Sequence, residues 1–294
     1  MAIAVVLSFP VSAADQRTFS SPEEAERSLT AAVRAGDTNQ LGAIFGPSAR
    51  EISNPDPVQA DRELKDLAKL LSTDAVLEER GGTNAILLIG SESWPFPVPL
   101  VKRDGHWLFD TLAGKEEIIN RRIGENELTT IGVCRAYLDA QRRYASQDRD
   151  GDGVLEFARK LVSSEGQRDG LYWPPDGEEE RSPFGPLAAY AQAQGYQGST
   201  AEGQEAFHGY FMRILNRQGK SAPGGKHDYL VNGNMIAGFA LVLWPAQWNE
   251  SGVMTFIVNQ QGKVFQKDLG PRTSSIASRI KAYDPDDTWS PVPE

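Results

Sequence analysis

Residues 236–270, IAGFALVLWPAQWNESGVMTFIVNQQGKVFQKDLG, decide the fold of the C-terminal part of the chain. Two apolar runs in this stretch, 236–245 and 253–270, are rich in the β-branched and aromatic residues that favour strands. The sequence NQQG at 259–262 supplies turn residues for a hairpin. Together with GYFMRIL at 209–215, these runs predict an antiparallel sheet.

A long helical pattern precedes the strands. Gly124 and Gly132 lie within this pattern, and because glycine weakens a helix, we expect a bend or break there. One long helix and an antiparallel sheet predict an α+β domain over residues 115–294, with a short helix at 275–282. The apolar residues at helical spacing are Ile118, Ile119, Ile123, Leu128, Ile131, Tyr137, Leu138 and Tyr144.

The N-terminal part has helices first and strands afterwards. The sequence SSPEE at 20–24 combines hydroxyl caps, a first-turn proline and acidic residues, which together start a helix. Another helix is expected at 61–71, and strands are expected from residue 75 onward, with a hairpin turn at Asp104 and Gly105. Helices followed by a small antiparallel sheet predict a separate α+β domain over residues 15–114.

Composition limits the kinds of partner. The 294 residues include 40 acidic and 30 basic ones, for a net charge of −10, so the overall field repels phosphate backbones and anionic lipid. We therefore expect no nucleic-acid partner. No stretch reaches the length of about 18 apolar residues that predicts a membrane span, so none is expected in the mature chain.

Residues 1–14, MAIAVVLSFPVSAA, indicate export. They are uncharged, apolar and end in small side chains, which is typical of most of a secretion signal. The basic segment that normally precedes such a run is missing, so we expect the true start to lie further upstream. The alternative is an apolar terminus with no role in export. A signal predicts a periplasmic or secreted bacterial protein.

The single cysteine, Cys134, cannot form an internal disulfide bond. It lies within the long helical pattern, and no CxxC motif surrounds it. We expect it to act as a small buried hydrophobic residue rather than as a reactive thiol.

The second half of the chain carries motifs of a known family. They are ELTTIGVCRAYLDAQRRYASQDRDGDG at 127–153, GLYWP at 170–174, FHGYFMRIL at 207–215, and the run from GGKHDYLVNGNM at 224 to the end of the quoted stretch at 270. In these segments the chain resembles the bacterial family known as domain of unknown function 2950, from about residue 18 to the C-terminus. The resemblance implies no established activity.

Two fainter resemblances concern the separate domains. The helix ending in DRDGDG, the GYFMRIL strand and the late hairpin are similar to the globular part of pseudopilins and pilin-like proteins. Pilins begin with an apolar assembly helix, whereas this helix is amphipathic and starts more than a hundred residues into the chain, so filament formation is not expected. The N-terminal domain resembles nuclear-transport-factor-like domains, a likeness of fold alone.

The sequence DRDGDG at 148–153 matches the first half of an EF-hand calcium loop. Carboxylates at loop positions one, three and five and a glycine at position six fit that pattern, but Arg159 occupies position twelve, where a bidentate acid normally binds. Two interpretations remain: a weak Ca²⁺ site, or a solvated turn that ends the long helix. The candidate ligands are Asp148, Asp150, Asp152 and Glu156.

Regular structure is expected to be sparse after this loop. Residues 156–162 predict a short helix, and 169–204 are rich in Gly, Pro, Ser and acids, which predicts a loop.

The three histidines, His106, His208 and His227, are too scattered to predict a metal cluster or a catalytic triad, so structural roles are expected. A hydrolase whose site combines His208, His227 and the acidic run at 178–180 is the alternative.

Aromatic residues beside prolines and glycines are the candidate ligand-binding residues, and core packing is the competing explanation. They are Trp173, Tyr210, Trp244 and Trp248. The function expected from these observations is a non-catalytic binding or assembly protein of the bacterial cell envelope, with an envelope protein, a peptide or a glycan as its partner.

Overall fold

The computed structural model describes residues 16–175, 181–194, 196 and 206–293. The segment 1–14, expected to be a signal, and the acidic run at 178–180 lie outside the described residues. The chain divides into two compact units between Arg122 and Ile123. The sequence places the domain boundary near Gly114, and Gly114 and the observed division lie in the same helix. Within the described ranges, no helix combines the length and hydrophobicity needed to cross a membrane.

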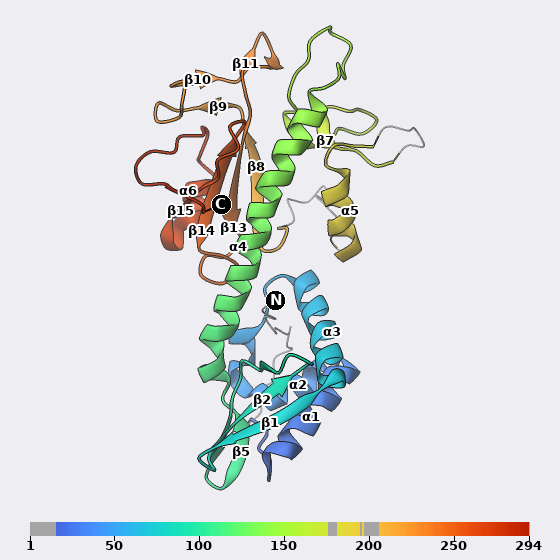
Figure 1. Cartoon of the computed structure of the whole chain (residues 1–294), viewed down its shortest axis with the longest axis vertical. Helices are drawn as coiled ribbons and strands as arrows, with labels where there is room; N and C mark the ends of the chain where they lie inside the picture. Colours follow the sequence, from blue (N-terminus) through green and yellow to red (C-terminus); the bar gives the residue numbers. More distant parts are fainter. Residues whose placement is uncertain (1–15, 176–180, 195, 197–205, 294) are drawn as a thin grey trace. The chain divides into compact units, whose positions relative to one another are not determined.

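The described residues of the first unit form three α-helices and a 3₁₀ helix before the antiparallel sheet (Figure 1). The helical elements are α1 (Pro22–Ala35), α2 (Thr38–Phe45), η1 (Gly46–Ile52) and α3 (Pro57–Thr73). The strands are β1 (Ala75–Arg80), β2 (Asn84–Ile89), β3 (Trp94–Pro95), β4 (Leu100–Arg103) and β5 (His106–Phe109), in the order β1-β2-β4-β5, with β3 also paired to β2.

Local signals explain the boundaries of these elements. The Ser21 hydroxyl accepts a hydrogen bond from the Glu24 N–H and caps α1. Asp104 and Gly105 have φ angles of 50° and 82°, so the expected turn joins β4 to β5. Helix α3 begins earlier than expected because the Asp56 side chain caps it just before Pro57. The unit is α+β, as predicted.

The long helix α4 (Thr111–Tyr144) starts in the first unit and continues into the second. Gly124 and Gly132 lie inside it, so neither glycine breaks the helix.

The second unit is built on a five-stranded antiparallel sheet, in the order β16-β15-β14-β13-β8. The strands are β8 (Tyr210–Leu215), β13 (Ala240–Pro245), β14 (Met254–Asn259), β15 (Phe265–Asp268) and β16 (Ser290–Pro291). The predicted strand runs therefore form the sheet, and β8 lies at one edge. The short helix expected after the sheet is α6 (Thr273–Ala277), preceded by η2 (Gly270–Arg272).

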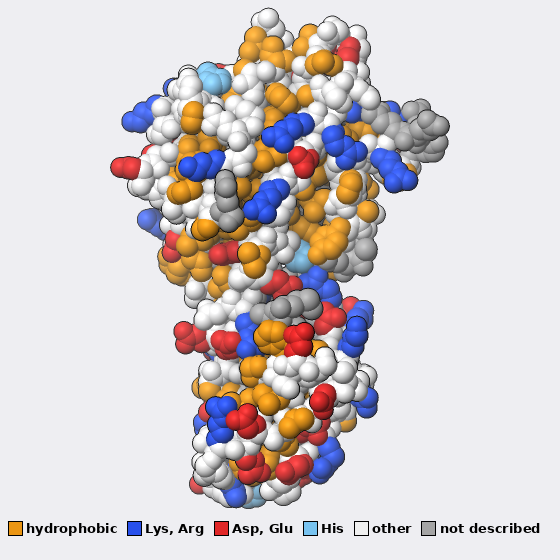
Figure 2. Space-filling model, in the orientation of Figure 1, with side chains coloured by type: hydrophobic (Ala, Val, Ile, Leu, Met, Phe, Trp, Pro, Cys, Tyr) orange, Lys and Arg blue, Asp and Glu red, His pale blue; other side chains and the backbone are white. Residues whose placement is uncertain are grey.

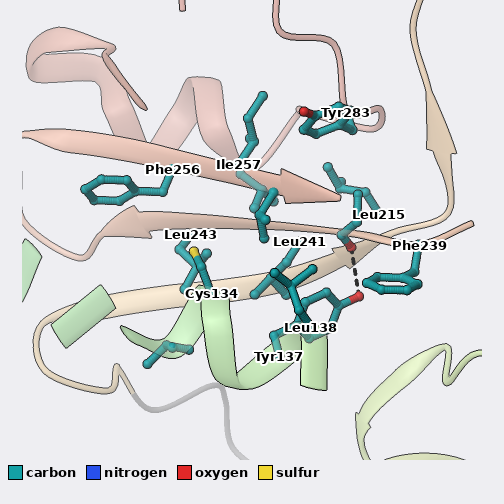
Figure 3. Packing of buried hydrophobic residues seen from close by; sticks show 14 of the residues in the cluster. Cys134, Tyr137, Leu138, Leu215, Phe239, Leu241, Leu243, Phe256, Ile257 and Tyr283 are labelled. Carbon is teal, nitrogen blue, oxygen red and sulfur yellow. Dashed lines mark hydrogen bonds between the residues drawn. The ribbon is translucent and has the colours of Figure 1, made fainter. Parts of the chain in front are cut away.

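Helix α4 covers one side of this sheet and α6 lies on the other (Figure 3). Cys134, Tyr137 and Leu138 of α4 point into the core, beside Leu241 and Leu243 of β13 (Figure 3). The Tyr137 hydroxyl also donates to the Ala240 carbonyl at 3.1 Å, which fixes the helix to β13.

Short elements complete this unit. They are β6 (Lys160–Val162) parallel to β7 (Gly170–Tyr172), α5 (Gly185–Gln194), the pair β9 (Arg217–Gln218) and β10 (His227–Asp228), and the pair β11 (Leu230–Val231) and β12 (Asn234–Met235). One prediction was wrong here: residues 156–162 form no helix. Helix α5 lies within the region 169–204, which was expected to be mostly loop.

Candidate ligand-binding site

The backbone register of β8 determines what this strand can bind. The Ala246 N–H donates to the Gly209 carbonyl at 2.8 Å, so hydrogen-bonded pairing with β13 begins at that residue. Tyr210 instead exchanges two hydrogen bonds with Phe207, at 2.9 and 3.1 Å, on the side away from β13. Because the pattern alternates along an antiparallel strand, the N–H and C=O of Ile214 also point away from β13.

A cavity of about 320 Å³ lies along this strand, within the usual range of roughly 300–1,000 Å³ for ligand pockets. Its apolar lining residues are Ile214, Leu215, Leu230, Met235 and Ile280, and Asn216 adds one amide. Its charged lining residues in the described part of the chain are all cationic: Arg159, Arg213, Arg217 and Lys281.

Arg213 is held in place by neutral groups. Its guanidinium donates to the carbonyls of Ser278 at 2.8 Å, Ala277 at 3.3 Å and Ile280 at 2.5 Å, all at the end of α6. The Trp244 ring lies 5.7 Å from the guanidinium carbon, within the range of cation–π contact. These partners orient Arg213 without neutralising it, and no carboxylate pairs with it among the described residues.

The other three cations differ in how far they are already paired. Arg159 donates to the Gly233 carbonyl at 3.0 Å, and Lys281 is exposed at the rim. Of these three, Arg217 is the one with an ionic partner among the residues that the structure describes, the Asp228 carboxylate at 3.3 Å. The cavity therefore combines an apolar lining with four cationic side chains and no acidic lining residue in the described part of the chain, which suits an anion with an apolar part.

The aspartate loop contacts the β11–β12 hairpin, where the Asn234 amide donates to Asp152. One carboxylate oxygen from each of Asp148, Asp150 and Asp152 lies within 4.8 Å of the other two, and all three side chains are exposed. The Gly153 and Gly151 N–H groups donate to Asp148 at 2.9 and 2.8 Å and hold the pKa of this carboxyl below its usual range.

Two carboxylates of the expected calcium loop accept hydrogen bonds from the β11–β12 hairpin. The Glu156 carboxylate accepts the Met235 N–H at 2.9 Å, and Asp152 accepts from the Asn234 amide at 2.6 Å. Arg159, at position twelve, also contacts this hairpin through Gly233. Among the described residues, Asp148, Asp150 and Asp152 form the group whose geometry could hold a cation, and Glu156 is not part of that group.

None of the four aromatic candidates is a lining residue of the cavity beside β8. Trp173, Tyr210 and Trp244 belong to the buried core of the second unit. The Tyr210 hydroxyl donates to the Met254 carbonyl at 3.0 Å, and Trp248 donates through Nε1 to Asp268 at 2.8 Å. Trp244 contributes indirectly, because its ring supports Arg213.

The histidines are also placed apart. His208 is buried among the rings of Tyr190, Tyr196 and Phe207. His227 lies in β10, beyond the six-residue strand β8, which spans about 20 Å at roughly 3.3 Å per residue. His106 is exposed at the start of β5. The structure does not bring His208 and His227 together.

The cationic residues were missed because they are far apart in the sequence. Arg159, Arg213 and Lys281 come from three different segments, and no spacing rule connects them. One signal was present: Arg213 is a charged residue inside the apolar run YFMRIL.

Fold and site together define an α+β chain whose C-terminal unit carries a cationic cavity of ligand size beside an edge strand. The chain belongs to the family described as Protein of unknown function (DUF2950), which it matches over residues 16–292. Comparison with curated proteins and with solved structures gave no match. The family resemblance is therefore confirmed, whereas the pilin-like and nuclear-transport-factor-like resemblances stay predictions.

Proposed function

We propose that this protein is a non-catalytic binding protein of the bacterial cell envelope, and that its second unit holds an anionic ligand in the cavity beside β8. The observation that carries the proposal is the lining of that cavity: four cationic side chains and no acidic one among its described residues, in a chain of net charge −10. A cleft lined by charges of one sign concentrates ligands of the opposite sign.

The apolar lining residues of the cavity further restrict the chemical class of the ligand. Ile214, Leu230 and Met235 lie along the same cavity as the cations, so a fully hydrated small anion would leave that surface uncovered. An apolar group attached to a carboxylate would bury this surface and place its charge near Arg213 and Lys281.

Binding of octanoate, measured by titration calorimetry, tests the proposal. We expect binding to the wild type that weakens as salt increases, because salt screens exposed charges. Lys281→Gln should weaken binding by about three- to fivefold, as expected for loss of one exposed ion pair. Arg279→Gln is the matched control, because it removes an exposed charge two residues away, outside the cavity lining. Equal affinities in the two variants would contradict the proposal.

The envelope assignment is supported by the sequence of residues 1–14 alone. Its test is fractionation of bacteria that express the gene from its native locus. We expect a processed protein in the periplasm or medium. An unprocessed protein confined to the cytoplasm would contradict export while leaving the binding proposal intact.

A second candidate function, a calcium-dependent module, is favoured by the convergence of Asp148, Asp150 and Asp152. Exposed acidic groups also gather without an ion, so the test has to be direct. This function predicts that millimolar CaCl₂ raises the melting temperature of the wild type and not that of a variant carrying Asp150→Asn and Asp152→Asn. The same calcium response in both proteins would exclude it.

A further inference from the structure

The edge of β8 has an open hydrogen-bonding position inside the cavity. Ile214 turns its N–H and C=O away from β13, and neither group forms a hydrogen bond with another described residue. Strand β6 approaches β8 without pairing with it, because its only strand partner in the described part of the chain is β7. Residues 213–217 all line the cavity, and the Asn216 carbonyl already accepts the Tyr229 N–H at 2.8 Å, so the open position that a ligand there can use is Ile214.

Strand geometry then decides where the side chains of an added strand would lie. A residue opposite Ile214 in an antiparallel strand exchanges two hydrogen bonds with it and shares its face of the sheet. The residues on either side of that position lie on the opposite face, which carries Arg213. Lys281 follows Ile280, whose carbonyl binds Arg213, so it belongs to the same end of the cavity.

We infer that the ligand is an extended acidic peptide that adds to the edge of β8 by antiparallel pairing at Ile214. An apolar residue faces Ile214, and acidic residues on either side of it meet Arg213 and Lys281. This inference rests on the proposed function and specifies its ligand. Such a peptide would use both the open backbone position at Ile214 and the cationic, partly apolar lining of the cavity. Strand addition supplies backbone hydrogen bonds, while the pockets and charges select the side chains.

Backbone methylation of a synthetic peptide tests strand addition. The probe is acetyl-Thr-Glu-Leu-Glu-Thr-amide, titrated into the full chain by calorimetry. N-methylation of the leucine removes the N–H that would donate to the Ile214 carbonyl, and we expect about tenfold weaker binding. N-methylation of the second glutamate is the matched control, because that N–H would point away from β8, and affinity should change less than twofold. The analogue with glutamine in place of both glutamates should bind about tenfold more weakly.

Ile214→Pro tests the same bond from the protein side. Proline lacks the outward N–H and is tolerated on an edge strand, where the N–H faces away from the sheet. We expect this variant to bind the parent peptide about as weakly as the wild type binds the leucine-methylated peptide, with folding checked by circular dichroism. If the variant does not fold, the two methylated peptides decide the question.

The outcomes separate this inference from the proposed function. Equal binding of both methylated peptides would overturn strand addition. Octanoate binding without peptide binding would overturn the peptide ligand and leave the anion site standing. Failure of both octanoate and peptide to bind would overturn the inference and the proposed function together.

Discussion

Cys134 shows how burial controls chemistry at a single residue. It is fully buried between α4 and the sheet, and burial raises the pKa of its thiol to about 12 (Figure 3). Because the thiolate is the reactive form, we predict no measurable reaction with the thiol reagent DTNB at pH 8 in the folded protein. Reaction should become complete in guanidinium chloride. Rapid labelling of the folded protein would contradict the buried position.

Asp148 gives a pH prediction. Hydrogen bonds from Gly153 and Gly151 lower the pKa of its carboxyl in the folded state, so the charged form contributes stability above the unfolded pKa, about 3.9. That contribution is lost as the pH falls through the lower, folded pKa. We predict that Asp148→Asn is less stable than the wild type at pH 7 in urea unfolding, and that the difference shrinks below about pH 4. A difference that stays constant down to pH 2 would contradict this account.

At the scale of elements, we predict that alanine substitution at two glycines changes the free energy of unfolding in opposite directions. Gly132 lies on the exposed side of α4, and an added Cβ there would meet no atom within 4 Å. Gly132→Ala should therefore raise the free energy of unfolding by about 0.5–1 kcal/mol.

Gly233, in the β11–β12 turn, has a φ of 94° and equal space around it. Gly233→Ala should lower the free energy of unfolding by about 1–2 kcal/mol, from backbone strain alone. Urea unfolding measures both variants. Equal effects of the two substitutions would show that the positive φ at Gly233 is not required.

The sheet of the second unit could be predicted because its signals are local. Apolar runs rich in β-branched and aromatic residues and the turn residues at 259–262 identify β13, β14 and β15 without knowledge of the fold. The helix predicted at 156–162 does not form, because contacts with residues distant in sequence determine the structure there. The helical spacing at 156–162 is overridden by distant partners, since Phe157 donates to the Met235 carbonyl and Glu156 accepts from the Met235 N–H.

The candidate site could not be predicted for a related reason. An edge strand is a property of sheet order, and the position of β8 at the edge depends on β13 pairing with both β8 and β14. The sequence indicates that YFMRIL is a strand, but not which of its two edges stays open. Helix α5 was missed because glycine and proline dominate the composition around it.

At the scale of the whole molecule, charge is unevenly distributed. On the face shown in Figure 2, Lys and Arg side chains outnumber acidic ones over the second unit, whereas both signs are mixed over the first unit. With a net charge of −10, the protein as a whole repels anions, so an anionic ligand has to be attracted by a local field. The cationic cavity beside β8 supplies such a field in a partly apolar setting, where charges are screened less than at an open surface.

The most direct test of the account is hydrogen exchange at the Ile214 amide, followed by nuclear magnetic resonance with and without the acidic peptide. In the free protein this N–H has no partner among the described residues, so we predict fast exchange. Saturating peptide should slow exchange at Ile214 at least tenfold and leave the Gly132 amide, within α4, unchanged. Unaltered exchange at Ile214 in the peptide-saturated protein would contradict strand addition at this edge.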